Sequence, residues 1–196
     1  QLRKYPKILG LIAALIFVYI AGHAVQTNWT FFTMYKFKWT ETLVGISLGV
    51  SGFMAALVQG YLIRFIQPKI GNEKSIFYGL SLYAVGMILF AFASESWMMF
   101  AFLVPYGLGG IAGPALQSVI SSEVPKSEQG ELQGALASLV SLTAIVGPPL
   151  MTNTFYYFTH DSAPFIFPGA PFFLGFLLMA ISAVIVYYVF REKRSH

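Results

Sequence analysis

The chain has 196 residues, of which 57% are hydrophobic and only 10% are charged, whereas soluble domains carry about 25% charged residues. This composition excludes an ordinary water-soluble domain, and the absence of cysteine excludes disulfides and cysteine-ligated metal sites, so we expect no cofactor. The formal net charge of +4 does not indicate nucleic-acid binding, because the basic residues lie at the ends of apolar runs, where they mark membrane topology and contact lipid headgroups.

Six segments are long and apolar enough to cross a lipid bilayer as helices of roughly 20 residues. The predicted spans cover about residues 7–34, 43–66, 75–93, 97–121, 132–158 and 165–190. The connections between them are short and polar, so they leave no room for a soluble domain. The sequence therefore predicts an all-α, multi-pass membrane protein with a single six-span domain over residues 1–196.

The positions of lysine and arginine predict the direction of each span, because basic residues are enriched on the cytoplasmic side. One side carries ten of them and the other side carries two, Lys36 and Lys38. Both termini are therefore expected in the cytoplasm. The chain begins with a short basic segment and no methionine, which indicates a piece of a longer protein. The ten are Arg3, Lys4, Lys7, Arg64, Lys69, Lys74, Lys126, Arg191, Lys193 and Arg194.

Polar residues interrupt the first span in the stretch FVYIAGHAVQTNWTFF, residues 17–32. Helical geometry places His23, Gln26, Thr27 and Thr30 on one face. Polar groups are costly in lipid, so this face either lines a cavity that holds water and substrate or hydrogen-bonds to neighbouring helices. Trp29 either borders the cavity, where its ring stacks on substrate, or anchors the helix at the membrane interface.

The later spans carry small residues, amides and prolines. Gly45, Gly49, Gly52, Ala56 and Gly60 share one face of the second span, which predicts either static close packing or a seam along which helices slide. Three amides, near the ends of spans two, four and five, either contact substrate or cap helices: Gln59, Gln117 and Asn153. Prolines inside the fourth and fifth spans predict kinks or hinges: Pro105, Pro114, Pro148 and Pro149.

Three stretches together resemble the carboxyl-terminal half of the tetracycline-efflux drug:proton antiporters of the major facilitator superfamily. GYLIRFIQPKIGNEKSIFYG, residues 60–79, is similar to the second copy of that superfamily's loop motif. GGIAGPALQSVISSEVPKSEQGELQGALASLVSLTAIVGPPL, residues 109–150, and WTETLVGISLGVSG, residues 39–52, resemble the antiporters in the same order.

The resemblance implies the second six-helix half of a twelve-helix transporter in the inner (cytoplasmic) membrane. Its implied partners are the amino-terminal six-helix half, the lipid bilayer, a small amphiphilic substrate and protons. It also implies that the first, second, fourth and fifth helices face a central cavity. Ala55 and Tyr83 stand where tetracycline pumps carry ionisable residues, which argues against tetracycline as the substrate. No acidic residue lies within the predicted spans, so His23 is the titratable candidate of this half.

Charged residues on the predicted cytoplasmic side form a candidate conformational latch. It would pair Arg64, Lys69 or Lys74 with the acidic residues of the link between spans four and five, which are Glu123, Glu128 and Glu131. Solvated surface charge is the alternative, because exposed ion pairs contribute only about 0 to 1 kcal/mol.

Two other classes of function are weaker fits. The stretch GISLG, residues 45–49, matches the G-x-S-x-G pattern of serine hydrolases, but a nucleophilic serine needs a base at its own depth. Among the histidines only His23 lies at membrane depth, on an earlier helix, so we expect no enzyme. A self-assembling six-helix channel or a membrane structural protein is the alternative. A channel needs a ring of charge or a re-entrant filter, and the sequence has neither.

Overall fold

The computed structural model describes residues 6–193, with side chains described for residues 8–191. Within this part of the chain all regular structure is helical, as the sequence predicts. Arg3, Lys4 and Arg194 lie outside the described residues, as do the side chains of Lys7 and Lys193. The elements are α1 (Pro6–Phe37), α2 (Glu41–Leu57), the π-helical turn η2 (Val58–Leu62), α3 (Ile63–Ile70), α4 (Asn72–Phe92), α5 (Ser96–Gly109), α6 (Ala112–Ser122), the 3₁₀ turn η3 (Lys126–Glu128), α7 (Gln129–Tyr157) and α8 (Ala170–Lys193).

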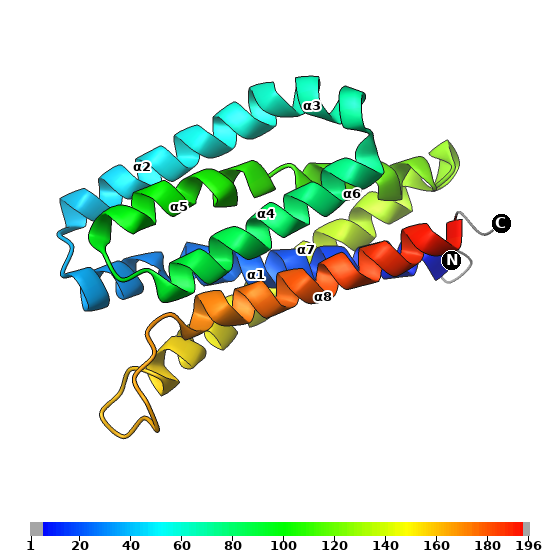
Figure 1. The fold of residues 1–196 in the computed structure, drawn as a ribbon. Coiled ribbons are helices and arrows are strands. Elements are labelled where there is room, and N and C mark those ends of the chain that lie inside the picture. The colour runs from blue at the N-terminus through cyan, green and yellow to red at the C-terminus, as the bar shows by residue number, and fades with distance from the viewer. Residues whose placement is uncertain (1–5, 194–196) are drawn as a thin grey trace.

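Six helical segments of the described chain are long and apolar enough to cross a membrane, which confirms the six-span prediction. The second span combines α2, η2 and α3, and the fourth combines α5 and α6. The start of α1 and the end of α8 lie at the same end of the bundle (Figure 1), as an even number of spans requires. The chain is therefore a multi-pass membrane protein, and the cytoplasmic placement of its termini stays a prediction.

The sixth span begins later than the sequence predicts. Its helix starts at Ala170, not at Phe165, and the preceding residues form a loop. Pro168 and Gly169 stand immediately before the helix, and a residue that precedes proline is disfavoured in the α conformation. Pro171 is tolerated because it lies in the first turn, where a backbone N–H has no partner within the helix.

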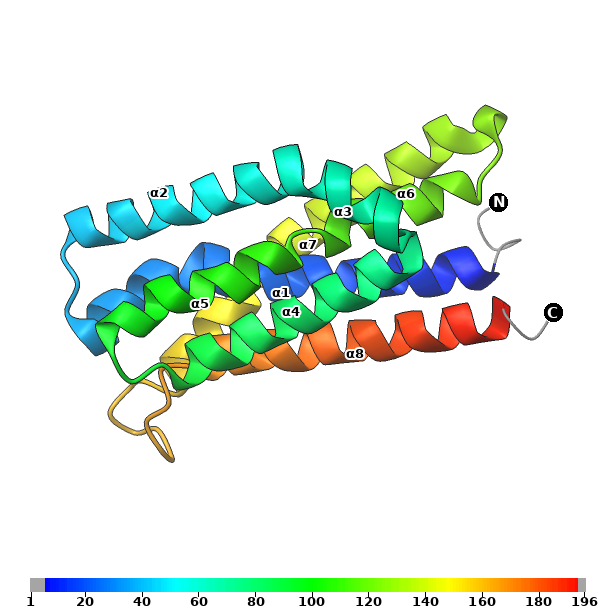
Figure 2. The ribbon, with the colours of Figure 1, turned by 45° about the horizontal axis from the view of Figure 1, so that its top comes forward.

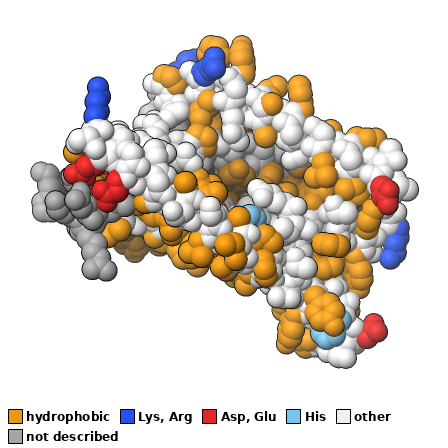
Figure 3. All heavy atoms as spheres, turned by 180° about the vertical axis from the view of Figure 1, so that it is seen from behind, with side chains coloured by type: hydrophobic (Ala, Val, Ile, Leu, Met, Phe, Trp, Pro, Cys, Tyr) orange, Lys and Arg blue, Asp and Glu red, His pale blue; other side chains and the backbone are white. Residues whose placement is uncertain are grey.

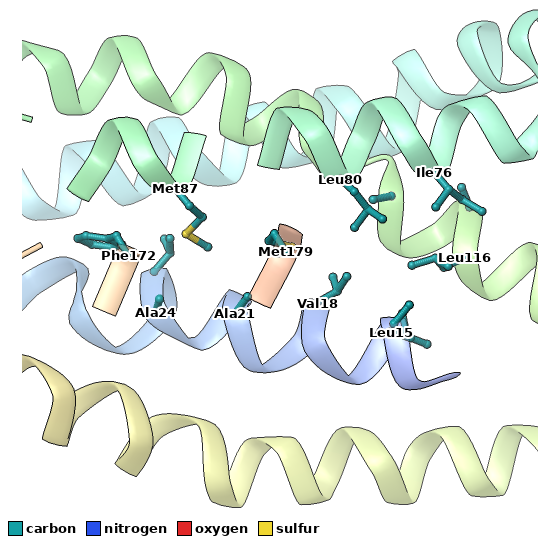
Figure 4. Packing of buried hydrophobic residues seen from close by; sticks show 14 of the residues in the cluster. Leu15, Val18, Ala21, Ala24, Ile76, Leu80, Met87, Leu116, Phe172 and Met179 are labelled. Atoms are coloured by element: carbon teal, nitrogen blue, oxygen red, sulfur yellow. The ribbon is translucent and has the colours of Figure 1, made fainter. Parts of the chain in front are cut away.

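The core of the bundle lies between α1, α4 and α8. Buried apolar side chains of α1, including Leu15 and Ala21, meet Leu80 and Met87 of α4 and Met179 of α8 (Figure 4). In lipid the hydrophobic effect does not drive such contacts, so close van der Waals packing holds the helices together. These three helices form a frame on which the other spans are placed.

Two glycines bring α4 against the fourth span. A Cβ added at Gly79 would lie 2.8 Å from the backbone N of Ala112, and one at Gly86 would lie 2.8 Å from Cα of Tyr106. The two glycines are seven residues apart and so share one face of α4. Any larger side chain at either position would push the two spans apart.

The second and fifth spans lie at the flanks of the bundle and are its least buried spans. Figure 2 shows α2 along one edge and α8 along the opposite edge, with α1 and α7 behind α4 and α5. The third and sixth spans, α4 and α8, pack extensively against each other. The helices α2 and α7, which other helices cover least, therefore border one face of the molecule.

Candidate functional site

The polar face of α1 lies on the surface of the chain. Gln26 is exposed, and His23, Thr27 and Thr30 are partly exposed, whereas Ala24 between them is buried. Figure 3 shows the molecule from behind, where the surface is hollowed and a histidine side chain is visible near the middle. The sequence placed these four polar residues on one face, and the structure leaves that face uncovered by the described part of the chain.

His23 packs directly on the fifth span. A Cβ added at Gly147 of α7 would lie 2.2 Å from Cδ2 and 2.7 Å from Cγ of the imidazole. Gly147 is followed by Pro148 and Pro149, whose missing N–H groups leave the carbonyls of Ala144 and Ile145 without helical donors. The imidazole therefore lies beside a stretch of helix whose backbone presents acceptors.

Threonine hydroxyls on α1 bond mainly within their own helix. Thr27 Oγ1 donates to the carbonyl oxygen of His23 at 2.6 Å and accepts from Nδ2 of Asn28 at 3.0 Å. Asn28 is fully buried, and its Oδ1 has no hydrogen-bond partner. Thr27 is thus partly committed to the helix, while Gln26 at the exposed edge is better placed to reach a ligand.

The three amides occupy different places. Gln117 of α6 donates to the hydroxyl of Tyr19, one turn from His23 on α1, so it extends the polar face of α1. Asn153 is exposed near the end of α7. Gln59 lies in the π-helical turn η2, well inside the second span and not near its end as the sequence analysis placed it.

The fourth span is broken at Gly110 and Ile111, between Pro105 and Pro114, the prolines that predict a kink or hinge in this span. A Cβ added at Gly110 would lie 3.6 Å from Nε2 of Gln59 and 3.7 Å from the hydroxyl of Tyr83. The break therefore faces the π-helical turn of the second span. Both features are irregular backbone at membrane depth, which is tolerated where it is buried in protein or lines a cavity, and π turns are frequent at functional sites.

Trp29 is not at the cavity or at an interface, which corrects both expectations for it. Its side chain is 2% exposed, its Nε1 donates to Oγ of Ser47 on α2 at 2.8 Å, and its ring meets Phe90 edge to face. Buried tryptophan normally finds a partner for its N–H, and here a serine of the next span supplies it. Trp29 joins α1 to α2 and α4 inside the bundle.

The latch residues lie at the end of the bundle where α3 meets α4 and where α6 turns into α7 (Figure 1). All of them are exposed except Glu128, which is half-buried. The structure brings the basic and the acidic residues of the latch to the same end of the bundle, and their pairing stays a prediction. Among the described residues, no cluster of three or more histidines and carboxylates could hold a metal ion.

Comparisons with known proteins give one consistent result. The profile of the Major Facilitator Superfamily matches residues 8–196. The class C tetracycline resistance protein of Escherichia coli is 35% identical over 153 residues, which is 76% of this chain and 39% of that protein. The class E protein of Escherichia coli is 39% identical over 139 residues, which is 71% of this chain and 34% of that protein. The chain thus spans well under half the length of these relatives.

A solved structure shares the fold. The in meso crystal structure of the POT family transporter PepTSo superposes with a TM-score of 0.68 at 17% sequence identity. The superposition covers 93% of this chain and 37% of that one. Six helices of a longer transporter therefore have the same arrangement as the six spans described above.

Proposed function

The chain belongs to the Major Facilitator Superfamily, and we propose that it is one six-helix half of a transporter that exports small amphiphilic compounds. The two relatives compared above are tetracycline resistance proteins, and each is more than twice as long as the matched part. The missing partner is then an amino-terminal six-helix half in the same inner membrane. No step of the proposed transport is enzymatic.

The uncovered polar face of α1 is the observation that carries the proposal. Polar side chains on a membrane-spanning helix are costly unless they meet protein or water. Here they lie on α1, whose neighbours α2 and α7 belong to the two least buried spans. The surface around a histidine on this side of the molecule is hollowed (Figure 3). A second bundle docked on this face would enclose a central cavity at the interface of the halves, where transporters of repeated architecture bind substrate.

The proposed cavity takes its polar groups from four spans. His23, Gln26, Thr27 and Thr30 come from α1, and Gln117, Gln59 and Asn153 come from α6, η2 and α7. An amphiphilic substrate would use the amides and the imidazole for orientation and the apolar walls for affinity. Tyr83 packs at the break of the fourth span, and Ala55 adds no charge, so a substrate other than tetracycline remains our expectation.

Transport would be coupled to proton entry and would proceed by alternating access. Each half would rock as a nearly rigid body around the central site. His23 is the proposed titratable group of this half, and a carboxylate on the other half would carry most of the coupling. An imidazole titrates near neutral pH, which suits such a role.

Cysteine accessibility in the full-length protein tests the site. Single cysteines replace His23, Gln26 or Thr30, and Ala24→Cys on the buried face is the matched control. We expect an aqueous thiol reagent to label the first three and not the control, and substrate to slow their labelling. His23→Ala should lower transport more than abundance. If positions 23, 26 and 30 were as unreactive as position 24 in every state, the polar face would only join helices and the proposed site would be wrong.

A further inference from the structure

A second site lies on the opposite side of the bundle from the polar face, between α4 and α8. A cavity of about 320 Å³ opens there at the end where α4 begins and α8 finishes. Its walls combine charged side chains, Glu73, Lys74 and Arg191, with aromatic side chains, among them Tyr78, Tyr187 and Phe190. Lysine and arginine beside tyrosines, at the ends of two membrane spans, are typical of the headgroup level of a bilayer.

An apolar groove continues from this cavity along the same two helices. It has a volume of about 510 Å³ and shares Phe77 and Tyr187 with the charged cavity. Its lining residues are small or aliphatic further from the end, namely Ser81, Ala84, Ala180, Ala183 and Val184. From Phe77 to Ala84 the groove follows two turns of α4, which is about 10 Å at 1.5 Å per residue.

We propose that this groove binds an anionic phospholipid, with the phosphate beside Lys74 and an acyl chain lying between α4 and α8. The two parts of the site match the two parts of such a lipid, because a cationic and hydroxyl-bearing pocket opens directly into an apolar channel. The charged cavity carries two basic groups and one acidic group, so it favours a negative headgroup over a zwitterionic one. Phe77 is 44% exposed and Tyr187 is 52% exposed, and both sides of the groove are open to the surrounding lipid.

This lipid would act on the frame of the bundle, not on the substrate site. The helix α8 packs against α4 and α1, and α4 packs in addition against the fourth span. A lipid bound between the ends of α4 and α8 would favour one distance between the two helices. The inference depends on the membrane spans and not on the proposed substrate, so the two proposals fail independently.

Native mass spectrometry of the purified chain, released from bilayers of equal phosphatidylglycerol and phosphatidylcholine, tests the headgroup. We expect retained phosphatidylglycerol to exceed phosphatidylcholine. Lys74→Gln should lower that ratio about fivefold, because one basic residue near an anionic surface contributes about that factor. Lys126→Gln removes an exposed cation of η3 outside the cavity and should leave the ratio unchanged. An equal effect of both variants, or no preference in the unchanged chain, would overturn the proposal.

The acyl groove is tested with a matched pair at one position. Ser81 lines the groove, and its hydroxyl donates only to the carbonyl oxygen of Phe77 in its own helix. Replacing Ser81 therefore breaks no hydrogen bond between helices. Ser81→Leu fills the groove and should reduce retention of both lipids, whereas Ser81→Ala should retain them. Equal retention by the two variants would contradict an acyl chain there. Loss of lipid together with pairs of chains in the spectrum would identify a second copy as the occupant and would also overturn the proposal.

Discussion

Gly147→Ala probes the contact between α1 and α7 that positions His23. The added Cβ would lie 2.2, 2.7 and 3.1 Å from Cδ2, Cγ and Cβ of His23. Distances below 3.0 Å cannot be kept, so the imidazole must rotate into the hollowed face or α7 must move away. Overpacking of this kind costs about 1–3 kcal/mol. Replacing glycine by alanine within a helix returns about 0.5–1 kcal/mol, so we expect a net loss of stability of about 0 to 2.5 kcal/mol.

The double variant separates the clash from other effects. In the His23→Ala background the two closest atoms are gone and only the contact at 3.1 Å remains. Gly147→Ala should then be nearly neutral or slightly stabilising, which gives an interaction energy of about 1–3 kcal/mol between the two positions. The free energy of unfolding is measured for the unchanged chain, the two single variants and the double variant. Each purified protein in detergent micelles is unfolded by titration with a denaturing detergent.

Gly134→Ala is the control on the same helix, because nothing lies within 4 Å of an added Cβ at that position. It should be neutral or stabilising by up to about 1 kcal/mol. The reasoning would be refuted if Gly147→Ala cost the same with and without the imidazole, since the clash would then not involve His23. It would equally be refuted if Gly134→Ala were the more damaging of the two.

Two further predictions concern the ends of the bundle. Single cysteines at Lys69 and Lys126 should be labelled by an impermeant reagent from the cytoplasmic side, and those at Lys38 and Asp161 from the other, because the basic residues divide ten to two; labelling of 38 and 69 from one side would disprove the six-span topology. Charge reversal at Lys69 or Glu131 should each impair transport by the full-length protein, with partial restoration in the double variant; additive damage in this cycle would leave these residues as solvated surface charges.

The number and type of the spans could be predicted because length and apolar composition alone determine them. The prolines of the fourth span predicted a kink or hinge there, but the exact position of the break could not be predicted. Glycine pairs occur inside continuous helices, and Pro105 and Pro114 can be accommodated by neighbouring residues. The close approach of Tyr83 to Gly109 requires a glycine immediately before the break, since a Cβ there would lie 2.7 Å from the tyrosine ring. That contact joins positions 26 residues apart and leaves no pattern in a single sequence.

The face of a helix can be predicted from spacing, but the neighbour of that face cannot. Spacing grouped His23, Gln26, Thr27 and Thr30 correctly on one side of α1 and placed Trp29 at its edge. A rotation of α1 by a few tens of degrees decides whether that edge meets the cavity or Ser47 of the next span. The serine at the right depth of α2 is the signal for the buried position, because it satisfies the indole N–H at 2.8 Å.

Gly45 and Gly52 of α2 are seven residues apart, as are Gly79 and Gly86 of α4, but the two pairs have different surroundings in the structure. Gly79 and Gly86 of α4 touch the backbone of the fourth span, whereas nothing lies within 4 Å of an added Cβ at Gly45, Gly49 or Gly52 of α2. The small-residue face of α2 therefore packs against no helix in the described part of the chain. The relatives are about twice as long as this chain, so a helix of the proposed other half is the natural candidate to cover it. If the proposed other half covers both faces, the hollowed face and the glycine face are two parts of one interface, and substitutions at Gly49 should impair assembly of the full-length protein without lowering the stability of this half.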